Sequence, residues 1–174
     1  MPFVEVYSPA GTVSAEQRNQ IAERLVAEVM KAEGAPDNEA ARSLSWLMWH
    51  EPTVWSIGGQ TVDGGEPPRY VVRVSVPAAS MNEAKKAKIA KAVTQVLADA
   101  DDQPDRLFGL PLASFVLINE VPEGNWGSLG QLFSFTDIAS FILKGAPGQM
   151  DDAEVREALA LAETQIEEPA PATR

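Results

Sequence analysis

The chain has 174 residues, of which 45% are hydrophobic and 22% are charged, and its formal net charge at pH 7 is -11. This length suits one compact domain with a sizeable buried core, and the acidic balance argues against nucleic acid or an anionic membrane as a partner. The sequence has no cysteine and a single histidine, His50, so it excludes disulfides and thiolate chemistry, and we expect neither a bound metal nor a cofactor.

The location of the protein is predicted from what the sequence lacks. No apolar run is long enough to span a bilayer, and the start of the chain has neither the basic nor the apolar region of a signal peptide. We therefore expect a cytoplasmic protein whose partners are small molecules or other proteins.

Pro2 is the first candidate functional residue. It follows the initiator Met1, which methionine aminopeptidase usually removes before so small a residue, and removal leaves a secondary amine at the start of the chain. An α-amino group titrates near about 7.7 to 8.0, and burial among apolar side chains lowers that pKa. Pro2 is thus a candidate general base near neutral pH, although an ordinary Met-Pro start is the plain alternative.

The first half of the chain predicts a strand, a helix and a second strand. Residues 3–7 are strand-like, and Ser14-Ala-Glu-Gln17 has the Ser-x-x-Gln form of a capping box, which indicates the start of a helix. Residues 46–51 predict the second strand, followed by proline, tryptophan and glycine. The helix carries an apolar stripe formed by Ile21, Leu25 and Val29.

The same order recurs in the second half. Residues 70–76 predict a strand, Ser80-Met-Asn-Glu83 has the form of a second capping box, and residues 115–121 predict another strand that again leads to proline, tryptophan and glycine. The intervening helix carries Ile89, Val93, Val96 and Leu97.

This repeat predicts the fold class, α/β (α+β), with two pseudo-symmetric βαβ units at residues 2–60 and 69–131. A right-handed crossover places each helix on one face of its parallel strand pair. Two such units back to back form a four-stranded mixed sheet with both helices on one face. We expect one domain over residues 1–145.

The other face of the sheet is expected to need a cover. Phe3 and Val71 lie there beside Glu5 and Arg73, and a partly apolar face of this kind predicts a closed homo-oligomer. The repeat makes Arg73 the counterpart of Glu5, so an ion pair on the sheet is expected. His50 shares its strand face with Trp46 and Met48, which favours a structural histidine at an interface.

The end of the chain predicts helical additions. Residues 136–144 indicate a short helix stopped by Gly145 and Pro147, and an acidic helix is expected from Asp151. Residues 146–174 are thus predicted to form an acidic helical tail with a disordered end, which carries no chemistry that the sequence identifies.

Pro2 on a strand, the βαβ units and the stretch Glu120-Val-Pro-Glu-Gly-Asn-Trp-Gly127 resemble the tautomerase superfamily. The resemblance covers residues 2–144, in the doubled form of fused 4-oxalocrotonate tautomerases, cis-3-chloroacrylate dehalogenases, malonate semialdehyde decarboxylases and macrophage migration inhibitory factor. It implies a homotrimer without a cofactor and a catalytic Pro2. It also implies that Trp126 walls the substrate pocket, where a core tryptophan is the alternative. Asn125 could donate its amide to an enol oxygen or simply form a turn.

The arginines that bind substrate carboxylates in this superfamily are missing. Thr12 and Ser80 stand at the loop positions and Trp46 stands at the second-strand position, which argues for a less charged substrate or weak binding of diacids. The replacement candidates are Arg73, Arg69 and Arg42, the last from a neighbouring subunit. Glu39 is near a functional acid of the decarboxylases, but an insertion follows it, and we treat it as a surface residue.

The predicted function is therefore an isomerase, in which neutral Pro2 catalyses keto–enol tautomerisation of a 2-keto acid or aryl pyruvate. Trp126, Asn125, Arg73, Trp46 and His50 are the candidate substrate-binding residues. One alternative uses protonated Pro2 as an acid in hydration, dehalogenation or decarboxylation of a small unsaturated or 3-oxo acid. Another is a trimeric scaffold or binding protein without catalysis.

Overall fold

Strand β1 (Phe3–Tyr7) and helix α1 (Ala15–Glu33) form the start of the first unit, as the sequence predicts. The computed structural model describes residues 2–62 and 66–144. The expected capping box is present: the Gln17 backbone N–H donates to the Ser14 hydroxyl at 3.2 Å, and the Ser14 N–H donates to the Gln17 side chain at 3.0 Å. The helix ends at Gly34, whose φ of 83° satisfies a left-handed C-cap.

The second unit consists of β5 (Tyr70–Pro77), α3 (Glu83–Asp99) and β6 (Ser114–Val121). The capping box predicted at Ser80 is wrong. Ser80 closes the short helix η1 (Ala78–Ser80) and donates its hydroxyl to the Pro77 carbonyl at 2.7 Å. Asn82, two residues further along, caps α3 instead, and its Oδ1 accepts a hydrogen bond from the Lys85 backbone N–H at 2.9 Å. Asparagine is as good an N-cap as serine.

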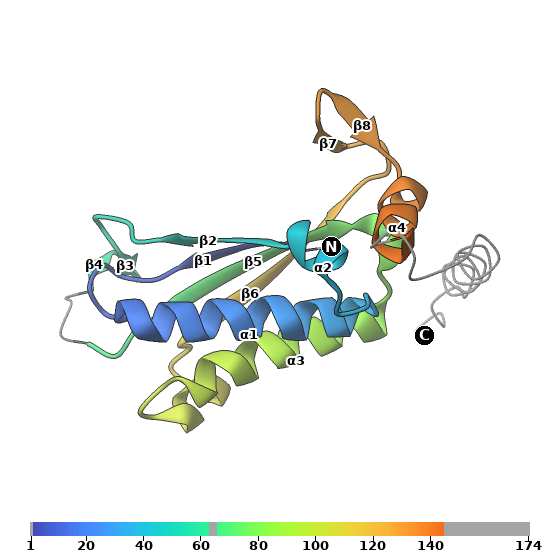
Figure 1. Ribbon diagram of the computed structural model, residues 1–174. Helices are drawn as coiled ribbons and strands as arrows, with labels where there is room; N and C mark the ends of the chain where they lie inside the picture. The colour runs from blue at the N-terminus through green and yellow to red at the C-terminus, as the bar shows by residue number, and fades with distance from the viewer. Residues whose placement is uncertain (1, 63–65, 145–174) are drawn as a thin grey trace, which may run out of the picture.

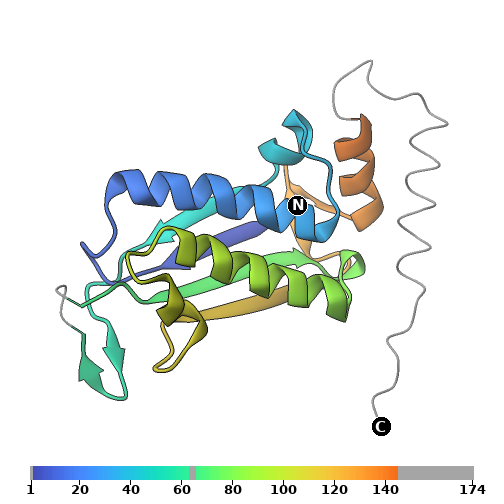
Figure 2. The same ribbon diagram turned by 90° about the horizontal axis from the view of Figure 1, so that it is seen from below.

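The four-stranded mixed sheet expected from the repeat is confirmed. Its strand order is β2-β1-β5-β6, where β2 is Trp46–His50. The β1/β2 and β5/β6 pairs are parallel, and β1/β5 is antiparallel with Glu5 opposite Arg73. Both long helices lie side by side on one face of the sheet (Figures 1 and 2).

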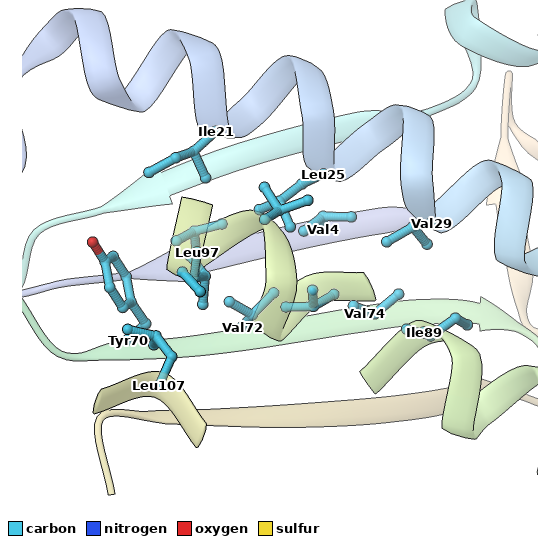
Figure 3. Packing of buried hydrophobic residues seen from close by; sticks show 14 of the residues in the cluster. Val4, Ile21, Leu25, Val29, Tyr70, Val72, Val74, Ile89, Leu97 and Leu107 are labelled. Atoms are coloured by element: carbon cyan, nitrogen blue, oxygen red, sulfur yellow. The ribbon is translucent and has the colours of Figure 1, made fainter. Parts of the chain in front are cut away.

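The main core lies between these helices and the sheet (Figure 3). Val4, Val6, Val72 and Val74 point from the central strands into it and are fully buried. The predicted stripes of α1 and α3 meet them from the other side. Their buried members are Ile21, Leu25, Val29, Ile89, Val93, Val96 and Leu97.

Further short elements were not predicted. Helix α2 (Glu39–Ser43) precedes β2, and η2 (Pro104–Phe108) precedes β6. Each unit also ends in a small hairpin, formed by β3 (Ser56–Ile57) with β4 (Gln60–Thr61) and by β7 (Trp126–Ser128) with β8 (Gln131–Phe133). The turns use positive φ angles, at Gly58-Gly59 and at Leu129-Gly130, so the internal repeat extends through the hairpins.

The short helix near the end of the chain is confirmed as α4 (Phe135–Lys144), which begins one residue before the predicted start. The acidic tail predicted at residues 146–174 and the stop at Gly145 lie outside the described residues. Within the ranges described, no helix has both the length and the apolar character needed to cross a membrane.

The face of the sheet opposite the helices is uncovered in one chain. It exposes large apolar side chains from its two outer strands. Their exposed fractions are 64% for Trp46, 42% for Met48, 56% for Phe115 and 47% for Leu117.

Candidate functional site

Pro2 is buried at the point where several elements meet. Its carbonyl accepts a hydrogen bond from the Trp46 backbone N–H at 3.2 Å, which ties it to the start of β2. Because β5 runs antiparallel to β1, the end of β5 and η1 lie beside the start of β1. Helix α1 runs back across the sheet, and its last turn comes to the same end of the molecule (Figures 1 and 2).

Glu33 is a buried acid at this end of the molecule, and the sequence analysis missed it. It is the last residue of α1, and only 5% of its surface is exposed. Burial raises the pKa of its carboxyl group, while the positive amino terminus and Lys85 act in the opposite direction. The signal was present in the helical period, because Glu33 follows Ile21, Leu25 and Val29 at the same spacing of four residues.

Lys85 contributes a positive charge to this region from the first turn of α3. Its ammonium donates to the Ser80 carbonyl at 3.0 Å and lies 3.9 Å from the point that a Cβ at Gly34 would occupy. Burial lowers the pKa of Lys85, and the charge of Glu33 raises it. A cation therefore lies beside the C-cap of α1.

Trp126 and Asn125 lie on the connection that follows β6. Trp126 begins β7 and packs against a second small apolar cluster that includes Met30 and Ile138. This matches the core-tryptophan alternative within one chain. Asn125 is exposed, and its backbone N–H donates to the Pro122 carbonyl at 3.0 Å, as expected for a turn.

The predicted ion pair on the open sheet face is present. Arg73 Nη1 lies 3.9 Å from Glu5 Oε2, and His50 Nε2 lies 3.6 Å from Glu5 Oε1. Tyr7 donates its hydroxyl to Glu5 at 2.7 Å and stacks on the His50 ring with centroids 4.4 Å apart. This polar cluster lies between the exposed Trp46 and Met48 on one side and Phe115 and Leu117 on the other, as the strand register requires.

The side chains of most remaining candidates make hydrogen bonds within one chain. Arg42 binds Asp37 through two hydrogen bonds, and Arg69 donates to the Leu112 carbonyl at 3.3 Å. Trp46 points its indole N–H to the Ser43 carbonyl at 3.0 Å. Glu39 is exposed at the start of α2, Thr12 donates to the Pro9 carbonyl at 2.8 Å, and Ser80 bonds within its own turn as described. Every arginine in the described part of the chain has an acidic partner on the same chain.

The second unit has a counterpart of the Pro2 position. With Glu5 opposite Arg73, the repeat relates Pro2 to Tyr70 at the start of β5. Tyr70 is buried, and burial raises its pKa to about 12. Arg106 binds Asp101 and also donates to the Pro68 carbonyl at 2.6 Å. The Tyr70 side chain thus fills the space at this end of the second unit, and these contacts close it from solvent.

Comparison with known proteins agrees with this arrangement. Residues 71–136 match the family model described as Tautomerase enzyme. This match lies within the second unit and extends from β5 to the start of α4. The resemblance expected from the sequence is thereby confirmed, and the described chain as a whole has the tautomerase fold. No curated protein matches the chain by sequence.

Solved structures show how far the tautomerase fold extends. N1, a member of the cis-3-chloroacrylic acid dehalogenase family, is 17% identical, covers 91% of this chain and 99% of its own, and has a TM-score of 0.61. The F6 fused 4-OT asymmetric trimer is 23% identical with coverages of 75% and 94% and a TM-score of 0.59. A macrophage migration inhibitory factor-like protein from Entamoeba histolytica is 14% identical with coverages of 76% and 98% and a TM-score of 0.56. At these identities the likeness shows a shared fold.

Proposed function

We propose that this protein is a keto–enol tautomerase in which the amine of Pro2, once Met1 is removed, acts as the general base. The observation that carries the proposal is the burial of Pro2 at the start of a central strand, beside the end of β5 and η1. Such burial disfavours the ammonium form and keeps an amine available as a base near neutral pH. The tautomerase fold supports the same chemistry.

In the proposed reaction, the substrate is the enol form of a 2-keto acid or aryl pyruvate, and Pro2 removes its enol hydroxyl proton. The resulting ammonium then returns the proton to the neighbouring carbon, which yields the keto form with no net gain or loss of protons. Negative charge develops on the enolate oxygen, so a positioned donor is needed. The Lys85 ammonium supplies positive charge at this end of the molecule, and Asn125, Trp126 or Arg73 of a neighbouring copy are the further candidates.

The proposal includes a homotrimer. Trp46, Met48, Phe115 and Leu117 leave an apolar rim around the polar cluster on the open sheet face, and a protein stable as a monomer rarely exposes so continuous a surface. The F6 fused 4-OT structure, which shares this fold, is a trimer. The cytoplasmic location expected from the sequence remains a prediction.

Substitution of Pro2 tests the catalytic assignment. Intact-mass spectrometry first establishes that Met1 is absent, and phenylenolpyruvate and 2-hydroxymuconate then serve as substrates. Pro2→Ala keeps an amine but changes its class, and it should lower kcat by about two to four orders of magnitude if Pro2 is the base. The exposed Pro36→Ala is the matched control. Full turnover in Pro2→Ala would exclude Pro2 as the base, whereas a retained Met1 together with no turnover would favour the scaffold alternative.

A second candidate function is acid catalysis by protonated Pro2. It is favoured by the similarity to N1, which covers a larger share of the chain than the other two structures described, and by the buried carboxyl of Glu33 close to the amino terminus. Assays with 3-haloacrylates and malonate semialdehyde discriminate between the two. Release of halide or carbon dioxide without tautomerase activity would favour the acid.

A further inference from the structure

Glu33 occupies a position that is costly for a carboxylate. It is almost fully buried, and it lies in the last turn of α1, where the partial negative charge of the helix dipole repels an anion. A glutamate at such a position needs compensation by nearby positive charge. Its neighbours on the same stripe, Leu25 and Val29, are purely apolar, so packing alone does not require an acid there.

The compensation comes from two sources that converge on the Pro2 end of the sheet. Lys85 interacts with Glu33 from the first turn of α3, and its ammonium is fixed by the Ser80 carbonyl. The second source is the amino group of the unprocessed chain, which lowers the pKa of the Glu33 carboxyl and so opposes the effect of burial. Removal of Met1 makes the Pro2 nitrogen the amino group of the chain, one residue further along and buried directly before β1.

The other charged groups on the elements around this cluster are engaged elsewhere. Lys31, in the last turn of α1, lies 3.5 Å from Glu28, and Lys86 pairs with Glu83 and with Glu120. Lys88 affects the cluster only through Lys85, whose pKa it lowers. The polar groups of β1 and β2, Glu5 and His50, lie on the opposite face of the sheet. Among the residues that the structure describes, Glu33 and Lys85 are thus the charged side chains that remain to be explained at the Pro2 end of the sheet.

We propose that Glu33 and Lys85 together set the protonation state of the Pro2 amine, with Glu33 stabilising the ammonium form and Lys85 opposing it. Both act as positioning residues for the base of the proposed function, on which this inference rests. Glu33 accepts a hydrogen bond from the ammonium that forms when Pro2 takes up the substrate proton. Lys85 neutralises Glu33 in the resting state, so that a neutral amine persists beside a buried carboxylate.

The proposal predicts opposite effects for two charge-removing substitutions. Glu33→Gln removes the anion that favours the ammonium, so the apparent pKa of the Pro2 amine should fall. Lys85→Gln removes a competing cation, so that pKa should rise. A charge at hydrogen-bonding distance shifts a pKa by about one unit or more, which corresponds to a tenfold change in the protonated-to-neutral ratio.

The experiment titrates the amine directly in full-length protein whose mass shows that Met1 is absent. Protein labelled with 15N-proline is titrated by NMR, and the pH profile of kcat/KM is measured in parallel. Glu33→Asp, which keeps the charge, should restore most of the wild-type titration. The controls are the exposed Glu23→Gln on α1 and Lys91→Gln on α3, which should leave it unchanged.

Shifts in opposite directions for Glu33→Gln and Lys85→Gln would support the proposal. Shifts in the same direction, or none, would overturn it, and Lys85→Gln with Glu33→Asp still decide the matter if Glu33→Gln fails to fold. The NMR titration needs no turnover. A failed proposed function, seen as full activity in Pro2→Ala, is therefore distinguishable from a failed charge pair, seen as an unchanged amine titration.

Discussion

Replacement of Tyr70 tests whether the counterpart of the Pro2 position is closed in the second unit. Tyr70 is 3% exposed and lies beside Leu107 at the edge of the core (Figure 3). Burial raises its pKa from 10.0 to about 12, with Asp101 adding to the effect and Arg106 opposing it. The folded protein should therefore keep the phenol proton at a pH where the unfolded chain has lost it.

The sign and size of the effect follow from that difference. Because the folded state binds the proton more tightly, the free energy of unfolding is unaffected below pH 10 and falls as the pH rises from 10 to 12. Two pKa units correspond to about 3 kcal/mol over the whole interval, of which about 1 kcal/mol is lost at pH 11. Tyr70→Phe has no phenol at this position and should show none of this loss.

The assay uses the fact that Tyr7 and Tyr70 are the only two tyrosines of the chain. In Tyr7→Phe, absorbance at 295 nm reports Tyr70 alone. Urea unfolding of Tyr7→Phe and of the double variant Tyr7→Phe/Tyr70→Phe is then followed by tryptophan fluorescence at pH 8 and pH 11. A Tyr70 that titrates near 10 in the folded protein, or equal losses in both variants, would refute the closed arrangement.

Three further substitutions test the cap, the open sheet face and the polar cluster. Asn82→Ala should lower the free energy of unfolding by about 1 kcal/mol in urea titrations, because Asn82 caps α3. Ser80→Ala should lower it by less. A larger loss in Ser80→Ala would instead support the capping box predicted at Ser80. Leu117→Glu should dissociate the proposed trimer in light scattering, because it places a charge in the apolar rim. Leu110→Glu is the matched control, because Leu110 lies on the connection before β6 with 87% of its surface exposed, and this variant should leave the trimer intact. An intact trimer in Leu117→Glu would exclude this interface. Glu5→Gln should lower the pKa of Tyr7, because the hydrogen bond to the Glu5 carboxylate is the main cause that raises this pKa. The Tyr70→Phe background leaves Tyr7 as the tyrosine that absorbance at 295 nm reports. An unchanged titration would contradict the hydrogen bond between Tyr7 and Glu5.

The sheet and its helices could be predicted because each depends on local periodicity and on the repeat. Alternation in residues 3–7 and 70–76 and the stripe through Ile21, Leu25 and Val29 determine which side chains face the core. The repeat also predicted that Glu5 faces Arg73, since equivalent residues of two antiparallel inner strands meet at the centre of the pair.

Other features depend on competition between neighbouring residues for one role, or on contacts between segments far apart in the chain, and the sequence does not reveal them. Ser80 and Asn82 are both good caps, and only the short turn before α3 decides between them. Glu33 was overlooked because an acid near a helix end usually lies in solvent, and its burial depends on the packing of α1 against distant parts of the chain such as α3. Whether Trp126 also walls a pocket depends on a neighbouring copy, while one chain shows its contacts with α1 and α4.

The closed position at Tyr70 has a consequence for any chain that joins two copies of this unit end to end. The nitrogen that begins the second copy becomes part of a peptide bond, and an amide cannot take up a proton at physiological pH. However alike the two halves are in shape, only the leading half can offer a basic backbone nitrogen. The trailing half is then free to fill the equivalent space with a bulky phenol, at no loss of reactivity.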